Sequence, residues 1–256
     1  MRDVLKSEEY FNNKIEELNE GIKRFQEWIR IGKTPPDRIN IVKRAMVWDI
    51  ISLVNCKYSQ GTSPIELKFD LLRAIDLTYE SWDGFWLAKR GGPNELLTLN
   101  QYGLDAYDQM LWMLSLGFLL NISDELFNRL IIVIDRDKVK DALFEFILSA
   151  KIRNRPPIRE ESYFESNGIP TLFFKLRTSL YETNNKNAEK LVEEFIREDW
   201  YRNHKDSGWY NSHKSKNNIY CGYWSYETAA IVKIKNLDDS SFRDCPYYPA
   251  DLVNVK

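Results

Sequence analysis

Apolar residues recur at steps of three and four along most of the chain, which is the period of an α-helix that buries one face. Pro35 and Pro36 end the first such stretch, and Pro36 followed by Asp37 suits the first turn of the next helix. No alternation of apolar and polar residues is long enough to require a sheet, although the pattern is compatible with a minor strand. The pattern therefore predicts an all-α fold. Residues 10–31 show it most clearly, with apolar positions at Phe11, Ile15, Leu18, Ile22, Phe25 and Ile29.

The same period predicts a series of further helices. Ser63, Pro64 and Glu66 have the spacing of a capped helix start, in which the serine side chain accepts a backbone N–H. Arg90 to Pro93 predict a loop, because two glycines and a proline follow one another there. The helices are expected over residues 39–58, 63–85, 99–120, 123–134, 137–152, 158–164, 170–181, 188–204 and 222–235.

The order of these helices indicates a multi-helix, bundle-like protein. We expect an N-terminal helical domain over residues 1–135 and a smaller C-terminal helical unit over residues 136–256. The double proline after Arg155 offers a short loop rather than a flexible linker. The two parts are therefore expected to share one core.

The last quarter of the chain is dense in aromatic residues, each beside a residue that fixes a turn or carries a charge. One interpretation is an aromatic strap that closes the C-terminal unit, with Gly222 allowing a close backbone approach and Pro249 setting an extended segment. Lys233 is then a candidate partner for Asp251. In the other interpretation the tryptophans and tyrosines anchor a partner protein, as they often do at interfaces. We favour the strap.

This order of residues resembles the C-terminal domain of the PoNi family, the immunity proteins that neutralise bacterial PoNe DNase toxins. The resemblance is strongest from residue 209 to residue 252 and weaker, merely helical, before that. It implies an all-helical, non-enzymatic, cytoplasmic protein that binds and blocks a cognate nuclease toxin. The motif positions are Trp209, Tyr210, Gly222, Tyr223, Trp224, Glu227, Lys233, Asp238, Asp239, Tyr247, Tyr248, Pro249 and Asp251.

Composition narrows the possible partners. A formal net charge of -2 over 256 residues argues against a free nucleic-acid binder. The charged N-terminus lacks the apolar run of a signal peptide, and the longest apolar stretch, residues 110–120, is too short for a bilayer. Three cysteines at unrelated spacings indicate no disulfide framework. We therefore expect a cytoplasmic protein without a membrane partner.

Motifs for catalysis are missing from the sequence. It has two histidines, no serine framed by glycines as in a nucleophile elbow, and neither a phosphate-binding loop nor a dinucleotide fingerprint. We expect no catalytic residue, no metal and no cofactor. The alternative is a zinc-binding protein, although the spacings suit no compact zinc site. Its ligands would come from His204, His213, Cys221, Cys245 and Glu227.

Two acidic helix faces are the candidate partner-binding sites. Their default interpretation is a solvated surface. The family resemblance gives them a second meaning, because carboxylates can compete for the basic groups with which a nuclease holds DNA. The candidates are Glu66, Asp70, Asp76, Glu80 and Asp83 on one helix, and Glu189, Glu193, Glu194 and Glu198 on another.

The sequence thus predicts an immunity protein that occludes a nuclease active site stoichiometrically, with sub-nanomolar affinity, about -12 kcal/mol or better. A helical scaffold or adaptor without toxin specificity shares every physical feature of this interpretation. Identification of the partner separates the two.

Overall fold

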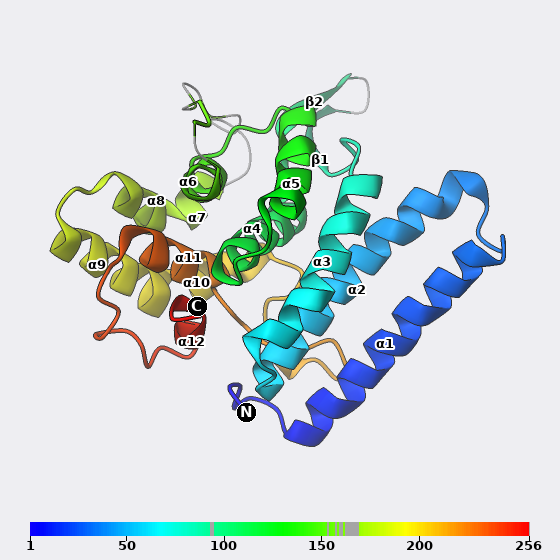
Figure 1. Cartoon of the computed structure of the whole chain (residues 1–256), viewed down its shortest axis with the longest axis horizontal. Helices are drawn as coiled ribbons and strands as arrows, with labels where there is room; N and C mark the ends of the chain where they lie inside the picture. Colours follow the sequence, from blue (N-terminus) through cyan, green and yellow to red (C-terminus); the bar gives the residue numbers. More distant parts are fainter. Residues whose placement is uncertain (93–94, 153, 157, 159–160, 162–168, 256) are drawn as a thin grey trace. The chain divides into compact units, whose positions relative to one another are not determined.

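The computed structural model describes residues 1–92, 95–152, 154–156, 158, 161 and 169–255 (Figure 1). Helices make up most of this described part, which confirms the all-α class. The chain forms two compact units. Unit 1 comprises Met1–Asp83 and Asn211–Tyr223, and unit 2 comprises Gly84–Tyr210 and Trp224–Lys256. A division of the chain at residue 135 stays a prediction.

Unit 1 is built on three successive helices, α1 (Glu8–Arg30), α2 (Ile39–Gln60) and α3 (Pro64–Ser81), with a short 3-10 turn, η1 (Pro36–Arg38), before α2. Each helix packs against the next, and they run in alternating directions (Figure 1, blue to cyan). The helix predicted over residues 10–31 is confirmed. It starts at Glu8, where Ser7 accepts the N–H of Tyr10 across 3.2 Å.

The two ends of α3 differ from expectation. Ser63 makes no side-chain cap to the backbone, and its hydroxyl instead donates to Glu66 Oε1 at 2.7 Å. The helix stops at Ser81 because Trp82 takes an extended conformation. Arg44 of α2 closes this end, donating to the Ser81 carbonyl at 2.9 Å, and so satisfies a carbonyl that the helix leaves unpaired.

A later segment of the chain, Asn211–Tyr223, completes unit 1 and is called the return segment below. It includes a short 3-10 turn, η4 (Ser212–Lys214). Tyr220 fixes the segment, because its N–H and carbonyl both bond the Tyr10 hydroxyl at 3.0 Å and its own hydroxyl donates to Asp3. Ser59 of α2 donates to the Cys221 carbonyl at 3.1 Å.

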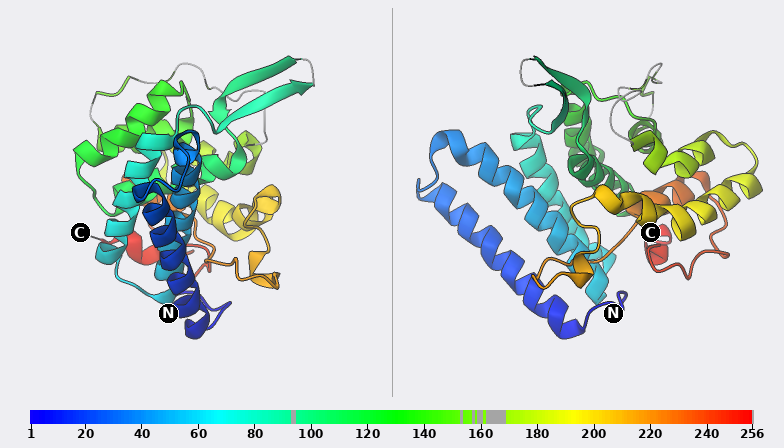
Figure 2. Two further views of the ribbon diagram at one scale, coloured as in Figure 1. Left: turned by 90° about the vertical axis from the view of Figure 1, so that its right-hand side faces the viewer. Right: turned by 180° about the vertical axis from the view of Figure 1, so that it is seen from behind.

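Unit 2 begins with an antiparallel hairpin, β1 (Leu87–Gly92) and β2 (Glu95–Tyr102), in which Arg90 pairs with Leu97 (Figure 2). The expectations of a loop from Arg90 and of a helix from residue 99 were therefore wrong over these residues. The leucines of residues 96–99 fit a helical period as well as a strand, and the alternation there is too short to decide between them.

The helices of unit 2 surround α4 (Leu104–Leu119), whose side chains are buried on almost every side. This agrees with the buried helix expected over residues 110–120, and no helix of the described chain has the length and apolar content to cross a bilayer. The remaining elements are α5 (Asp124–Arg136), α6 (Ala142–Lys151), α7 (Ile169–Leu172), α8 (Phe174–Tyr181), α9 (Asn185–Glu194), η2 (Phe195–Asp199), α10 (Trp200–Asn203), η3 (His204–Asp206), α11 (Tyr226–Lys235) and α12 (Ala250–Val253).

Several predicted helix limits shift in unit 2. The helix expected from Asp137 begins only after Asp141, whose carboxylate caps it by accepting from the N–H groups of Leu143 and Phe144. The helix expected over residues 188–204 starts at Asn185 and is interrupted by the π-turn η2. Most of the short helix expected over residues 158–164 lies outside the described residues.

Candidate functional site

The acidic residues predicted on α3 have different environments. Glu66, Glu80 and Asp83 are exposed, and Asp76 is partly so. Glu80 accepts from Lys43 at 2.8 Å, and Asp83 accepts from Arg44 at 3.1 Å. The helix therefore presents a partly paired acidic surface that follows its C-terminal half.

Asp70 lies apart from this surface. Its side chain is almost fully buried, and its two oxygens bond Lys57 at 2.5 Å and Arg73 at 2.9 Å. A buried carboxylate held by two cations stabilises the packing of α2 against α3 and offers a partner little.

Large apolar side chains share the outward surface of α3. Ile65, Phe69 and Tyr79 keep 80%, 70% and 41% of their surface exposed. At 3.6 residues per turn they fall in one sector with Asp76 and Glu80. We call these five residues the open face of α3. The sequence-based prediction of a binding site on this helix named only its acidic residues, since the helical period alone does not show which apolar residue is left uncovered.

The acidic residues predicted on α9 and η2 bind other parts of unit 2. Glu189 accepts the N–H of Asp238 at 3.0 Å, and Glu193 accepts from the Ser241 hydroxyl at 2.9 Å. Lys175 of α8 pairs with Glu194 at 3.2 Å and with Glu198 at 3.4 Å. These carboxylates thus fasten neighbouring segments of the protein's own chain.

The aromatic motif residues of unit 2 form a stacked cluster around Trp200. Trp209 stacks on Trp200 with ring centroids 5.3 Å apart, and Tyr247 lies 5.2 Å from the same ring. Tyr201 stacks on Tyr247 at 5.1 Å and meets Tyr210 at 4.7 Å. Trp224 is buried as well. Contacts of this kind stabilise the fold, and Trp209, Tyr210 and Tyr247 are half-buried in them.

A buried polar network lies against this cluster. Trp209 Nε1 donates to Asp108 at 3.1 Å, and His204 Nε2 lies 3.6 Å from the same carboxylate. Burial lowers the pKa of His204, but the Asp108 charge and the hydrogen bonds to Asp108 and Trp200 more than offset this, and the pKa ends above its ordinary value. Burial raises the pKa of Glu227 to about 7, against the hydrogen bonds from Ser225 and Trp200.

The rest of the motif holds turns together. In unit 1, Tyr223 is buried with its hydroxyl 2.8 Å from His213 Nδ1, and Gly222 has a φ of 110°, which favours glycine. In unit 2, Tyr248, which precedes Pro249, donates to Asp239 at 3.1 Å, and Asp238 accepts the N–H of Ser240.

Lys233 has different partners from the one expected. Its ammonium donates to the Val255 carbonyl at 2.7 Å and to the Leu119 carbonyl at 3.4 Å, whereas Asp251 is exposed. The end of the chain is therefore held to α11 by a backbone carbonyl rather than by the predicted carboxylate.

The zinc interpretation finds no support in the described part of the chain, where no three His, Cys, Asp or Glu side chains are grouped to hold a metal. Both ring nitrogens of His204 already face oxygens, Nδ1 at 2.5 Å from the Trp200 carbonyl and Nε2 near Asp108. Cys245 Sγ lies 3.6 Å from the Ile196 carbonyl. These contacts suit a packed interior.

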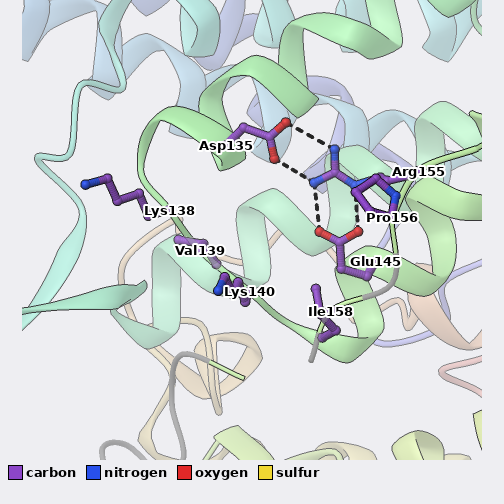
Figure 3. A pocket seen from close by; sticks show the side chains of 8 residues that line it. All are labelled: Asp135, Lys138, Val139, Lys140, Glu145, Arg155, Pro156 and Ile158. Atoms are coloured by element: carbon purple, nitrogen blue, oxygen red, sulfur yellow. Dashed lines mark hydrogen bonds and ion pairs between the residues drawn. The ribbon is translucent and has the colours of Figure 1, made fainter. Parts of the chain in front are cut away.

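A hollow of about 500 Å³ opens beside α5 and α6 in unit 2 (Figure 3). Arg155 reaches across it, donating to Asp135 Oδ1 and to Glu145 Oε2, each at 2.6 Å. The hydrogen bond to Glu145, followed by that to Asp135, raises the pKa of Arg155. Since both carboxylates accept hydrogen bonds from the same fixed guanidinium, neither is free to act as a general base. The lining consists of Asp135, Lys138, Val139, Lys140, Glu145, Arg155, Pro156 and Ile158.

Family comparisons identify the class of protein to which this fold belongs. Residues 2–132 match the family described as PoNe immunity protein (PoNi), N-terminal, and residues 139–252 match PoNe immunity proteins (PoNi), C-terminal. The chain therefore belongs to the PoNi family of immunity proteins. This confirms the resemblance carried by the aromatic motif, and membership supports an immunity function.

A solved structure has a similar fold. The crystal structure of protein PA2201 from Pseudomonas aeruginosa superposes with a TM-score of 0.63, covering 95% of this chain and 86% of that chain at 16% sequence identity. At that identity the likeness shows the fold alone. Among curated proteins, none matches the chain at a significant level.

Proposed function

We propose that this chain is an immunity protein that binds a cognate PoNe-type DNase toxin and blocks its active site. The observation that carries the proposal is the order of the two PoNi family domains, which together account for residues 2–252. The inhibition is stoichiometric, without turnover or cofactor. It takes place in the cytoplasm, where a nuclease toxin would reach the genome.

The open face of α3 is the surface we propose for the toxin. A DNase holds a polyanion on basic groups, so its active-site rim complements the carboxylates of Asp76 and Glu80. Ile65 and Phe69 are exposed beside them and supply apolar area that becomes buried on binding. Apolar anchors next to charged rim residues are the usual composition of a tight protein interface.

The acidic residues of α9 and η2 are the less suitable surface. Glu189 and Glu193 bind the segment around Asp238 and Ser241, and Lys175 pairs with Glu194 and Glu198. A toxin would have to displace these internal partners before it could use the carboxylates, whereas the Lys43–Glu80 pair beside the open face of α3 is partly exposed on both sides and is weaker. The cost of breaking such pairs reduces any gain from new ones.

Co-expression with a PoNe-type nuclease toxin encoded beside this protein's gene tests the function itself. Cells that carry both genes should survive, and the purified proteins should form a one-to-one complex with a Kd below about 1 nM. Survival must be accompanied by loss of DNase activity in the purified complex. If the chain captures a different protein and leaves the nuclease active, it is the general helical adaptor instead.

Charge reversal tests the surface. Asp76→Lys combined with Glu80→Lys should raise the Kd about tenfold or more and flatten its dependence on salt. Glu16→Lys combined with Glu20→Lys makes the same change in charge on exposed positions of α1 and serves as the matched control. If the two double substitutions raise the Kd equally, the carboxylates of α3 act only through the overall charge of the protein. Circular dichroism checks that each variant remains helical.

Phe69→Ser tests the apolar part of the same face. Truncation of a central aromatic anchor costs on the order of 2 kcal/mol, about thirtyfold in Kd. Phe174→Ser on α8 is the control, because that phenylalanine is exposed to a similar extent, 66% against 70%. A larger loss of toxin affinity from Phe174→Ser than from Phe69→Ser would indicate that the toxin binds unit 2 instead.

A further inference from the structure

The fold brings together two cysteines that lie far apart in the sequence. Cys56 is on α2, and Cys221 is on the return segment, so both belong to unit 1. A contact between Ser59, one turn along α2 from Cys56, and the Cys221 carbonyl places the two residues side by side, and each thiol shifts the pKa of the other. The third cysteine, Cys245, belongs to unit 2 and contacts the Ile196 carbonyl instead.

Several contacts fix the position of Cys221 over α2. Ser59, one turn after Cys56, donates to the Cys221 carbonyl at 3.1 Å. Tyr220 is held on both its N–H and its carbonyl by Tyr10, and Gly222 follows with a φ of 110°. The backbone on either side of Cys221 is thus restrained, so that the thiol stays close to Cys56.

The two thiols differ in exposure and in chemistry. Cys56 has no exposed surface, whereas Cys221 is partly exposed. The hydrogen bond that Cys221 receives from Cys56 lowers its pKa, and the charge of Lys14 and a hydrogen bond with Ser52 act in the same direction. Burial raises the pKa of Cys56 well above its ordinary value. Of the two thiols, Cys221 therefore loses its proton more readily and is the better nucleophile.

We propose that Cys56 and Cys221 form a redox-sensitive dithiol, which a hydroperoxide converts into a disulfide between α2 and the return segment. The inference concerns unit 1 alone and stands whether or not the partner is a nuclease. The position of Cys221 against the turn of α2 that contains Cys56 and Ser59, rather than any spacing in the sequence, is what carries it.

The oxidation proceeds in two balanced steps. The Cys221 thiolate attacks one oxygen of hydrogen peroxide, the O–O bond breaks, and the released hydroxide takes a proton to become water. Cys56 then attacks the sulfenic sulfur of Cys221, the S–O bond breaks, and the proton from Cys56 leaves with the oxygen as a second water. The two thiols are oxidised together by two electrons, and the peroxide is reduced.

Peptide mapping of the full-length protein tests the proposal. After treatment with hydrogen peroxide, quenching with iodoacetamide and digestion, the peptides of Cys56 and Cys221 should appear linked, about 2 Da lighter than their sum. Dithiothreitol should abolish the linked species. Before oxidation, iodoacetamide should modify Cys221 at least about tenfold faster than Cys245. Linkage through Cys245, or no intramolecular linkage at all, would overturn the proposal.

Single variants separate the roles of the cysteines. Cys56→Ser should abolish the linked peptide and leave Cys221 as a sulfenic acid that dimedone traps. Cys245→Ser is the matched control and should keep the linkage. Oxidation should raise the Tm of the wild type and of Cys245→Ser but not of Cys56→Ser, since only the first two can close the loop. A rise in Cys56→Ser would assign the stabilisation to another modification.

Discussion

The indole of Trp200 donates its N–H to the carboxyl group of Glu227 across 2.6 Å, and both residues are almost completely buried. The hydroxyl of Ser225 donates to the same oxygen at 2.7 Å. Glu227 Oε2, by contrast, has no hydrogen-bond partner among the described residues. A carboxyl group in such surroundings favours its neutral form, which accounts for a pKa of about 7.

Stability is therefore expected to fall as the pH rises through the range in which Glu227 ionises. Its pKa in the folded chain, about 7, exceeds the ordinary value of 4.5, so folding takes up a proton between these values. The stabilisation is complete below pH 4.5 and is lost as the pH rises to 7 and beyond. A difference of this size corresponds to roughly 3 kcal/mol in the free energy of unfolding. Urea unfolding at pH 5 and pH 8 measures the change.

Glu227→Gln isolates the contribution of this group, because the amide keeps an acceptor for Trp200 but does not titrate. The variant should lose most of the difference between pH 5 and pH 8. Glu198→Gln is the control, since Glu198 is exposed and its substitution should leave the pH dependence unchanged. Wild-type behaviour in the Glu227 variant would refute the assignment. His204 adds a dependence of the same sign, which is smaller in the variant because the Glu227 charge helps to raise the pKa of His204.

Asp108→Asn should lower the pKa of His204. Burial of the imidazole lowers its pKa, and without the Asp108 carboxylate only weaker interactions offset that effect. The amide also leaves a hydrogen bond imperfect at Trp209 or Ser207, which should destabilise the chain by about 1–3 kcal/mol. Histidine NMR titration provides an internal control, because the chain has only one other histidine, His213, which lies in unit 1. A shift of both resonances would indicate a general rearrangement.

The spacing of apolar residues was enough to predict those helices in which the buried residues recur with the helical period. Phe11, Leu18 and Ile22 are buried in α1 as their spacing predicts, and Lys14 is buried with them. The same spacing did not predict β2, because the leucines around residue 97 fit both the period of a helix and that of a strand. Pairing with β1 decides that case, and pairing is a tertiary property.

The candidate site shows the same limit. Spacing correctly groups Asp76 and Glu80 on one side of α3, but it cannot show that Lys57 of α2 comes to lie against Asp70 and removes it from the surface. The aromatic residues of the tail motif turn out to be stacked or buried, whereas Asp238 and Asp251 of the same motif are exposed. Likewise, nothing local in the sequence relates Cys56 to Cys221, because the fold alone brings them together.

Asp70→Asn should reduce stability rather than toxin binding alone. The amide leaves Lys57 and Arg73 beside a neutral group in a buried setting, which costs on the order of 2–4 kcal/mol. Glu66→Gln, at an exposed position of the same helix, should change stability by less than about 0.5 kcal/mol. Denaturant midpoints of the two variants measure the contrast. Equal midpoints would show that Asp70 is more solvated than its contacts indicate.

Gly222→Ala should destabilise the return segment by about 1–2 kcal/mol, because a φ of 110° suits glycine and strains a residue with a Cβ. Gly21→Ala is the matched control. Gly21 lies in the middle of α1 with nothing within 4 Å of an added Cβ, so alanine there should stabilise the chain by about 0.5–1 kcal/mol. Urea unfolding of both variants should thus shift the midpoint in opposite directions. A neutral Gly222→Ala would mean that the segment relaxes into another backbone conformation, and Cys221 would then no longer be held against Cys56.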